Sequence, residues 1–161
     1  MPSFDVISKI NYQEFDNAIA NCLREVSNRY NFKNVNISIE RKDKTITTIA
    51  SDDLKLKQIN ELLETHLIRR KVDPRVLSIK NSEGASGSTI RQISELSEGI
   101  NHENAKKIIN NVKKLKLKIQ IKIQGEELRI EGKKRDDLHE SISAIKSINI
   151  QLPIEFVNFR D

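Results

Sequence analysis

Apolar residues recur at helical spacing in four stretches of the chain. The first follows Asn11, a residue type that caps helix starts, and the second follows Asp52-Asp53 and ends before Pro74. The third begins after Asn101 and the fourth near Asp136-Asp137. The apolar stripes are Phe15, Ile19, Cys22, Leu23, Val26 and Tyr30; Leu56, Ile59, Leu62, Leu63 and Leu67; Ala105, Ile108, Ile109 and Val112; and Leu138, Ile142 and Ile145. The pattern predicts four amphipathic helices.

Between these stretches the period changes to two, which is typical of half-buried strands. Residues 35–40 alternate in this way, turn at 42–44 and return through 45–50. The same unit recurs at 116–124, with a turn near Gly125 and a return through 128–130. Shorter strands are expected at 4–8, 76–80, 89–96 and 154–159.

The expected order is strand, helix, hairpin, helix, strand, and this order occurs twice. It is the order of the ferredoxin-like βαββαβ unit, so we expect an α+β protein with two tandem ferredoxin-like domains. Each antiparallel sheet would have two helices on one face and an open polar face. Residues 81–88, the Gly/Ser-rich stretch, are expected to be the linker. Their G-x-x-G spacing at 84–87 lacks the ending of a P-loop.

Charge is distributed unevenly over the 161 residues. The whole chain has a net charge of +5, but the stretch 101–135 alone has 11 basic and 4 acidic residues. This asymmetry favours a polyanionic partner for one face, with an ordinary solvated surface as the alternative.

Composition excludes several classes of protein. No apolar run approaches the ~20 residues of a membrane helix, so we expect no membrane association. The N-terminus lacks the pattern of a secretory signal, and the single cysteine, Cys22, allows no internal disulfide or zinc cluster. We therefore expect a cytoplasmic protein.

The predicted strand at 116–124 has polar residues at alternate positions, which strand geometry places on one face. The polar side chains of this face are Lys116, Lys118, Gln120 and Lys122, together with Arg129 from the returning strand. Such a face can follow a phosphate backbone, and Gln120 could bond a base or sugar. Lys133, Lys134 and Arg135 would extend it to a helix start whose amides favour anions. A hydrophilic face that lysines protect from aggregation is the alternative.

Side chains for base stacking and catalysis are sparse. RNA-recognition domains stack bases on aromatic residues of their two central strands, and the corresponding strands here contain none. Phe156 and Phe159 are three apart in a strand, so we expect opposite orientations, with one ring exposed. The histidines are isolated in the sequence: His66, His102 and His139. We expect no enzymatic activity, no cofactor and no metal site.

Several runs of the sequence resemble the YajQ family of bacterial proteins, and the resemblance covers the whole chain. The runs are Met1-Pro2-Ser3-Phe4-Asp5; Ser86-Gly87-Ser88-Thr89-Ile90-Arg91-Gln92; Leu115-Lys116-Leu117-Lys118-Ile119-Gln120; Ile123-Gln124-Gly125-Glu126-Glu127-Leu128-Arg129-Ile130-Glu131-Gly132-Lys133-Lys134-Arg135-Asp136-Asp137-Leu138; and Phe156-Val157-Asn158-Phe159-Arg160-Asp161. The resemblance implies two ferredoxin-like domains that exchange their N-terminal strands. One domain would comprise 9–100, including the strand 89–96, and the other 101–161 plus the strand 3–8.

The resemblance also implies nucleotide binding, with RNA, purine nucleotides or cyclic-di-GMP as ligands. Our first hypothesis is a non-enzymatic nucleic-acid-binding protein that uses the basic sheet face. The second is a cyclic-di-GMP receptor that acts through a protein partner, with Arg91 and Arg160 reaching the phosphates of a ligand between the domains. The sequence leaves both hypotheses open.

Overall fold

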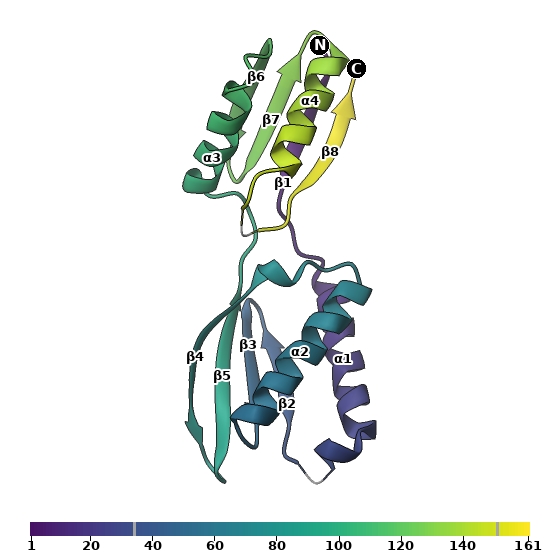
Figure 1. Ribbon diagram of the computed structural model, residues 1–161, viewed down its shortest axis with the longest axis vertical. Helices are drawn as coiled ribbons and strands as arrows, with labels where there is room; N and C mark the ends of the chain where they lie inside the picture. The colour runs from purple at the N-terminus through teal and green to yellow at the C-terminus, as the bar shows by residue number, and fades with distance from the viewer. Residues whose placement is uncertain (34, 151) are drawn as a thin grey trace. The chain divides into compact units, whose positions relative to one another are not determined.

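The structure is a computed structural model that describes residues 1–33, 35–150 and 152–161. Its strands and helices follow the predicted order, which confirms the α+β fold with two ferredoxin-like units (Figure 1). The elements are β1 (Ser3–Ile7), α1 (Tyr12–Asn28), η1 (Tyr30–Phe32), β2 (Ser38–Lys42), β3 (Thr45–Ala50), α2 (Asp53–Arg69), η2 (Pro74–Val76), β4 (Leu77–Ala85), β5 (Thr89–Leu96), α3 (His102–Lys113), β6 (Ile119–Gln124), β7 (Glu127–Gly132), α4 (Arg135–Lys146) and β8 (Glu155–Arg160).

The chain forms two compact units. The terminal unit contains both ends of the chain, Met1–Lys9 and Glu98–Asp161, and the central unit is Ile10–Ser97. In the part of the chain that the structure describes, every helix is too short or too polar to cross a bilayer.

The sheet of the terminal unit has the strand order β6-β7-β1-β8, and its neighbouring strands are antiparallel. Helices α3 and α4 cover one face of this sheet (Figure 1). The first strand of the chain, β1, is therefore a central strand of the sheet that the last residues complete. Phe4 and Val6 of β1 are fully buried against the helices, with Leu128 and Ile130 of β7 beside them.

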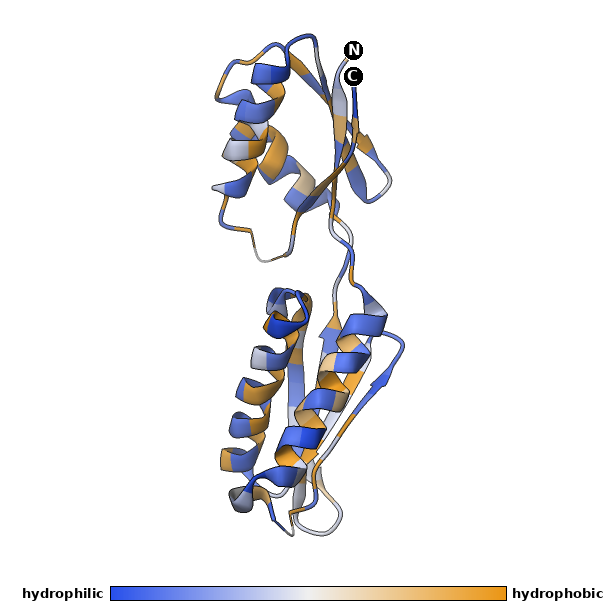
Figure 2. Cartoon of the chain, turned by 90° about the vertical axis from the view of Figure 1, so that its right-hand side faces the viewer, coloured by the Kyte–Doolittle hydropathy of each residue, from blue (hydrophilic) through white to orange (hydrophobic). Residues whose placement is uncertain are grey.

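The sheet of the central unit has the order β2-β3-β5-β4, again antiparallel. Helices α1 and α2 pack on one face, and their apolar stripes form the core with Ile39, Ile46 and Leu96 (Figure 2). Strand β5, which falls in the second half of the predicted pattern, belongs to this sheet.

Three of the four predicted helix starts are confirmed by their caps. The Asn11 side chain accepts a hydrogen bond from the backbone N–H of Glu14, and that of Asp52 accepts one from Lys55. Asn101 caps α3 in the same way. Each cap satisfies a backbone donor that the first helical turn leaves free.

The prediction that 81–88 is a linker is wrong. Residues 81–85 extend β4, which pairs with β5 up to the partners Ala85 and Thr89. The turn between the strands has two residues with positive φ, Gly87 at +74° and Ser88 at +60°. Small residues that favour a flexible linker also favour a tight hairpin turn, so composition alone did not separate the two.

Candidate nucleotide-binding surface of the terminal unit

The open face of the terminal sheet contains one row of residues that crosses all four strands. Lys122 of β6 is paired with Arg129 of β7, Arg129 with Asp5 of β1, and Asp5 with Val157 of β8. Paired residues of neighbouring strands share a face. The row therefore places Asp5 of the first strand directly beside Arg129, which the sequence predicted as a phosphate contact.

Asp5 neutralises Arg129. The Asp5 residue is only 3% exposed, and its carboxylate accepts hydrogen bonds from Arg129 Nε at 3.0 Å and from Asn158 Nδ2 at 2.8 Å. Burial alone would raise the pKa of Asp5, but these hydrogen bonds and the nearby charges of Arg129 and Arg160 outweigh it and lower the pKa. The hydrogen bond to Asp5 in turn raises the pKa of the Arg129 guanidinium. Arg129 thus has a carboxylate partner that the sequence did not indicate, and its contact with a phosphate stays a prediction.

A second carboxylate neutralises Lys122 on the same face. Lys122 Nζ lies 3.3 Å from Glu131 Oε2, although the lysine side chain is 55% exposed. The negative charges of Glu131 and Glu127 also raise the pKa of the Arg129 guanidinium. On the open sheet face, the charges of Lys122 and Arg129 are therefore each balanced by a carboxylate.

Lys116 and Lys118 do not lie on the predicted strand face. Strand β6 begins at Ile119, and Lys116 occupies the turn after α3 with φ at +54°. Alternation of Lys with Leu and Ile suggested a strand from 116, but the end of α3 at Lys113 leaves these residues in the connecting turn. Both lysines are exposed, and the side chain of neither forms an ion pair or hydrogen bond with any residue that the structure describes.

Lys118 and Lys133 line one hollow, which we call the lysine hollow. Its volume is about 350 Å³, and its lining residues are Met1, Lys118, Ile119, Gln120, Glu131, Gly132 and Lys133. Ile119 is paired with Gly132, so Lys118 and Lys133 flank the same end of the β6–β7 ladder. Among the described residues Lys133 has no ion-pair partner either, and the only carboxylate in the lining is the partner of Lys122. The lysine hollow combines two uncompensated cations with the amide of Gln120.

The start of α4 contains basic and acidic residues side by side in the sequence. Lys134 is the N-cap residue but makes no side-chain cap hydrogen bond, and Arg135 forms an ion pair with Asp161. Asp136 and Asp137 occupy the first turn of α4. These carboxylates already interact with the positive end of the helix dipole. The helix start therefore attracts an external anion less than the sequence predicted.

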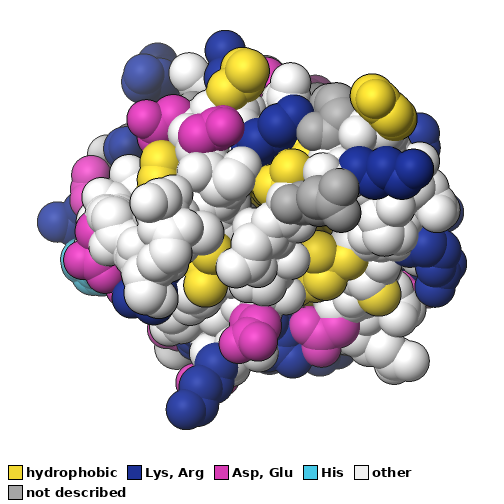
Figure 3. Space-filling view, turned by 90° about the horizontal axis from the view of Figure 1, so that it is seen from below, with side chains coloured by type: hydrophobic (Ala, Val, Ile, Leu, Met, Phe, Trp, Pro, Cys, Tyr) yellow, Lys and Arg dark blue, Asp and Glu magenta, His cyan; other side chains and the backbone are white. Residues whose placement is uncertain are grey.

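The last two predicted site residues, Arg91 and Arg160, belong to different units. Arg91 belongs to β5 of the central unit, where its guanidinium lies 3.7 Å from Glu83 Oε1 of β4. Arg160 belongs to β8 of the terminal unit and is exposed. Figure 3 looks onto the end of the central unit that is lowest in Figure 1, and on its described part Lys and Arg side chains are interspersed with Asp and Glu.

Phe156 and Phe159 lie on the same side of β8, so the expectation of opposite orientations is wrong. The ring centroids are 5.9 Å and 5.6 Å from that of Phe4, respectively. The pairing of β1 with β8 shifts register between Ser3 and Asp5, and Asn158 has φ at +56°. This bulge changes the alternation between the two aromatic residues. Phe159 is 62% exposed, so one exposed ring is present.

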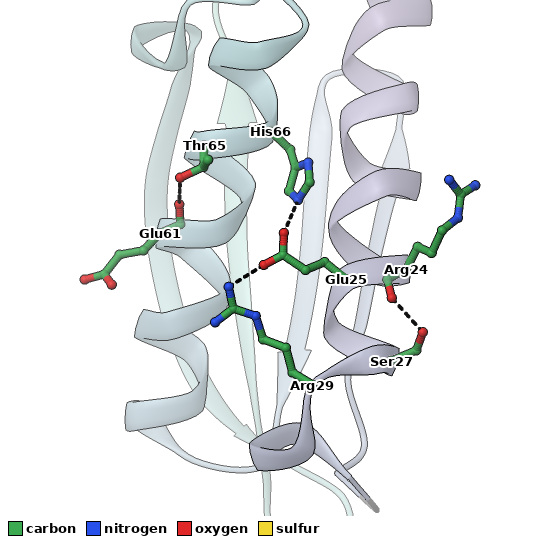
Figure 4. A network of polar contacts seen from close by, with 7 residues as sticks. All are labelled: Arg24, Glu25, Ser27, Arg29, Glu61, Thr65 and His66. Atoms are coloured by element: carbon green, nitrogen blue, oxygen red, sulfur yellow. Dashed lines mark hydrogen bonds and ion pairs between the residues drawn. The ribbon is translucent and has the colours of Figure 1, made fainter.

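The isolated histidine of α2 has a structural partner. His66 Nε2 lies 2.9 Å from Glu25 Oε1 of α1, and the same carboxylate accepts a hydrogen bond from Arg29 (Figure 4). Cys22 is fully buried, and burial, with a smaller contribution from Glu25, raises the pKa of its thiol to about 12. Among the described residues, no group of three or more His, Cys, Asp and Glu side chains could hold a metal ion.

Sequence reasoning missed two contributors to the surface. Asp5 pairs with a residue 124 positions away, and only knowledge of the strand order could have revealed that pairing. Met1 enters the lysine hollow because Gly132 N donates a hydrogen bond to Pro2 O at 3.1 Å, which fixes the N-terminus beside the end of β7. The predicted set included all four lysines of this surface whose side chains have no ion-pair partner among the described residues, namely 116, 118, 133 and 134.

Comparison with known proteins assigns the chain to a family. Residues 2–160 match the family described as nucleotide-binding protein, YajQ-like. A nucleotide-binding protein of Pelagibacter ubique is 77% identical over 161 residues, and one of Paramagnetospirillum magneticum is 49% identical, each with full coverage of both chains. A nucleotide-binding protein of Chloroherpeton thalassium is 44% identical over 98% of this chain and 97% of its own. The chain therefore belongs to the YajQ-like family.

Proposed function

We propose that the protein is a non-enzymatic nucleotide- and nucleic-acid-binding protein whose terminal unit contacts phosphates with the lysines at the start of β6 and the end of β7. The phosphate-binding residues would be Lys116, Lys118, Lys133 and Lys134, with Gln120 bonding a base or sugar. The names of the relatives, which are called nucleotide-binding proteins, support the ligand class.

The observation that carries the proposal is the contrast between the two sets of cations. Lys122 and Arg129 have carboxylate partners within 3.3 Å, and a phosphate would have to displace those partners. Lys118 and Lys133 have no such partner among the described residues and share a hollow of about 350 Å³. A phosphate that enters this hollow gains charge-assisted hydrogen bonds without breaking an ion pair.

The preferred ligand is single-stranded RNA, because the four lysines extend along a turn, a strand end and a helix start rather than around one point. If about four phosphates are neutralised, the logarithm of the association constant should fall with the logarithm of the salt concentration with a slope of about −3. A single dinucleotide, which has two phosphates, should give a slope about half as steep.

The test is a titration of the full-length protein with a labelled short single-stranded RNA, followed by fluorescence anisotropy over a range of salt concentrations. A parallel calorimetric titration uses cyclic-di-GMP. Binding of RNA with the steep slope supports the proposal. Saturable binding of cyclic-di-GMP with no binding of RNA would replace it with the receptor hypothesis, and the absence of binding to both would overturn the assignment of this surface.

A further inference from the structure

A second hollow of about 190 Å³ lies in the terminal unit, between α4 and the end of β8. We call it the Phe159 hollow. Pro2, Leu138, Ile142 and Phe159 give it apolar walls, and the polar groups that our argument uses are His139 and Arg160. Ligand sites in proteins typically combine apolar walls with a few convergent polar groups.

Phe159 supplies an aromatic surface that is exposed and yet held in place. Its ring is 62% exposed, and it stacks on the fully buried ring of Phe4 with centroids 5.6 Å apart and an interplanar angle of 24°. Stacking on a buried ring restricts the side chain before a ligand arrives. An aromatic ring with two side-chain torsions loses little further entropy when it makes a contact.

The Phe159 hollow adjoins the lysine hollow along the chain. Lys133 lines the lysine hollow and Arg135 lines the Phe159 hollow, two residues further on. In the same way, Met1 lines the lysine hollow and Pro2 lines the Phe159 hollow. Residues 133–135 and 1–2 thus connect the two hollows along the chain, and in the proposal below a nucleotide extends along them from Lys133 to Phe159.

We propose that the Phe159 hollow is a nucleobase subsite, in which Phe159 stacks on a base and the His139 ring bonds the edge of that base or its ribose. The inference rests on the proposed function, because the phosphates would be bound at the lysine hollow. Arg160 also lines the hollow, and its guanidinium would stack on the base or bond the adjoining phosphate. Unlike the usual RNA-recognition platform, this subsite uses an edge strand rather than the two central strands.

The test compares two polyanions in the full-length protein: a short oligoadenylate, which has bases, and inorganic polyphosphate, which has none. Phe159→Leu keeps an apolar side chain over Phe4 but removes the aromatic surface. We expect this variant to bind oligoadenylate about tenfold more weakly than the unmodified protein and to bind polyphosphate equally well. Equal binding of oligoadenylate would overturn the subsite, whereas failure of the unmodified protein to bind either probe would overturn the phosphate site as well.

A second variant makes the test independent of affinity. The chain contains no tryptophan, so Phe159→Trp introduces a single fluorescent reporter into the hollow. We expect saturating oligoadenylate to quench this fluorescence through base stacking and polyphosphate to leave it unchanged. The matched control is Tyr30→Trp, at a site in the central unit that is 87% exposed, where neither probe should quench. Saturated oligoadenylate binding without quenching at position 159 would refute the subsite.

Discussion

Arg129 Nε of β7 donates a hydrogen bond to Asp5 Oδ1 of β1 across 3.0 Å, between two paired positions on the open face of the terminal sheet. Asn158 of β8 donates to the other carboxylate oxygen, so one acidic side chain joins three neighbouring strands. The contact has two consequences. It ties the first strand into the sheet, and it removes Arg129 from the cations that a phosphate could reach at no cost.

Asp5→Ala should destabilise the terminal unit, because Arg129 and Asn158 both lose their acceptor. The loss of hydrogen bonds that involve a charged group predicts a decrease of about 1–3 kcal/mol in the free energy of unfolding. Amide hydrogen exchange detected by NMR checks this by unit: exchange in β1 and β7 should accelerate, while exchange in α1 and α2 should not. Unchanged protection in β1 would contradict the structural role of Asp5.

Stability of the terminal unit should also depend on pH through Asp5. The pKa of Asp5 is lowered in the folded protein, so the unfolded chain takes up the proton first as the pH falls. The contribution of Asp5 is complete above the ordinary Asp pKa of about 4 and is lost as the pH falls below it. In an acid titration followed by NMR, Asp5→Asn should flatten this part of the profile for the terminal unit. Identical profiles for the variant and the unmodified protein would show that Asp5 contributes nothing to it.

Gly99→Ala should destabilise the protein, because Gly99 has φ at +86° and its N–H bonds Ser8 O at 2.6 Å. The left-handed conformation costs a residue with a Cβ about 1–2 kcal/mol. A Cβ would also stand 2.4 Å from Glu126 Oε2, although that carboxylate can move. Gly84→Ala is the control, since this glycine of β4 has no positive φ and an added methyl group would meet no other atom within 4 Å. Equal midpoints of thermal unfolding for the two variants would contradict this explanation.

Glu25→Ala should destabilise the central unit, because it leaves the buried His66 and Arg29 without their shared acceptor. Burial alone would raise the pKa of Glu25, but hydrogen bonds from His66 and Arg29 outweigh it and lower the pKa. We expect a loss of about 1–3 kcal/mol, measured by urea unfolding with tyrosine fluorescence, since Tyr12 and Tyr30 both belong to this unit.

Glu61→Ala is the control for that measurement. Glu61 is an exposed residue of α2, and its side chain points away from the network in Figure 4. This substitution should change the free energy of unfolding by no more than about 0.5 kcal/mol. An equal loss for the two variants would indicate a general effect of removing negative charge rather than the contact with His66.

The local part of the fold could be predicted from the sequence. Helix starts at Asn11, Asp52 and Asn101 are determined by cap residues and apolar spacing within a few positions. The hairpin at 81–88 was missed because Gly and Ser serve a linker and a positive-φ turn equally well. The orientation of Phe159 was missed because a bulge at Asn158 interrupts the alternation.

The candidate site was predicted only in part, for a different reason. The lysines could be identified from their density in the sequence, but which of them are neutralised depends on contacts between distant strands. Asp5 compensates Arg129 only because β1 lies beside β7. Lys122 and Glu131 are closer in the sequence, but their ion pair requires the register of the β6–β7 hairpin. Which charges are balanced depends on strand order and register, and the hydrophobic periodicity of the sequence does not reveal these.

The central claim, that phosphates bind at the lysine hollow, is tested most directly by charge reversal at Lys118 and Lys133. The matched control reverses Lys106 and Lys107, two exposed lysines of α3 that change the charge of the same unit equally but line neither hollow. Both double variants should have the thermal midpoint of the unmodified protein, because all four side chains are exposed.

Binding of a labelled single-stranded RNA is then measured over a range of salt concentrations. For Lys118→Glu with Lys133→Glu we expect an affinity loss of about a hundredfold or more, and a salt slope that is shallower by about 1.4 because two phosphate contacts are lost. The α3 control should lose only a few-fold in affinity at low salt and retain the slope. Equal losses in the two double variants, or an unchanged slope in the first, would contradict phosphate binding at the lysine hollow.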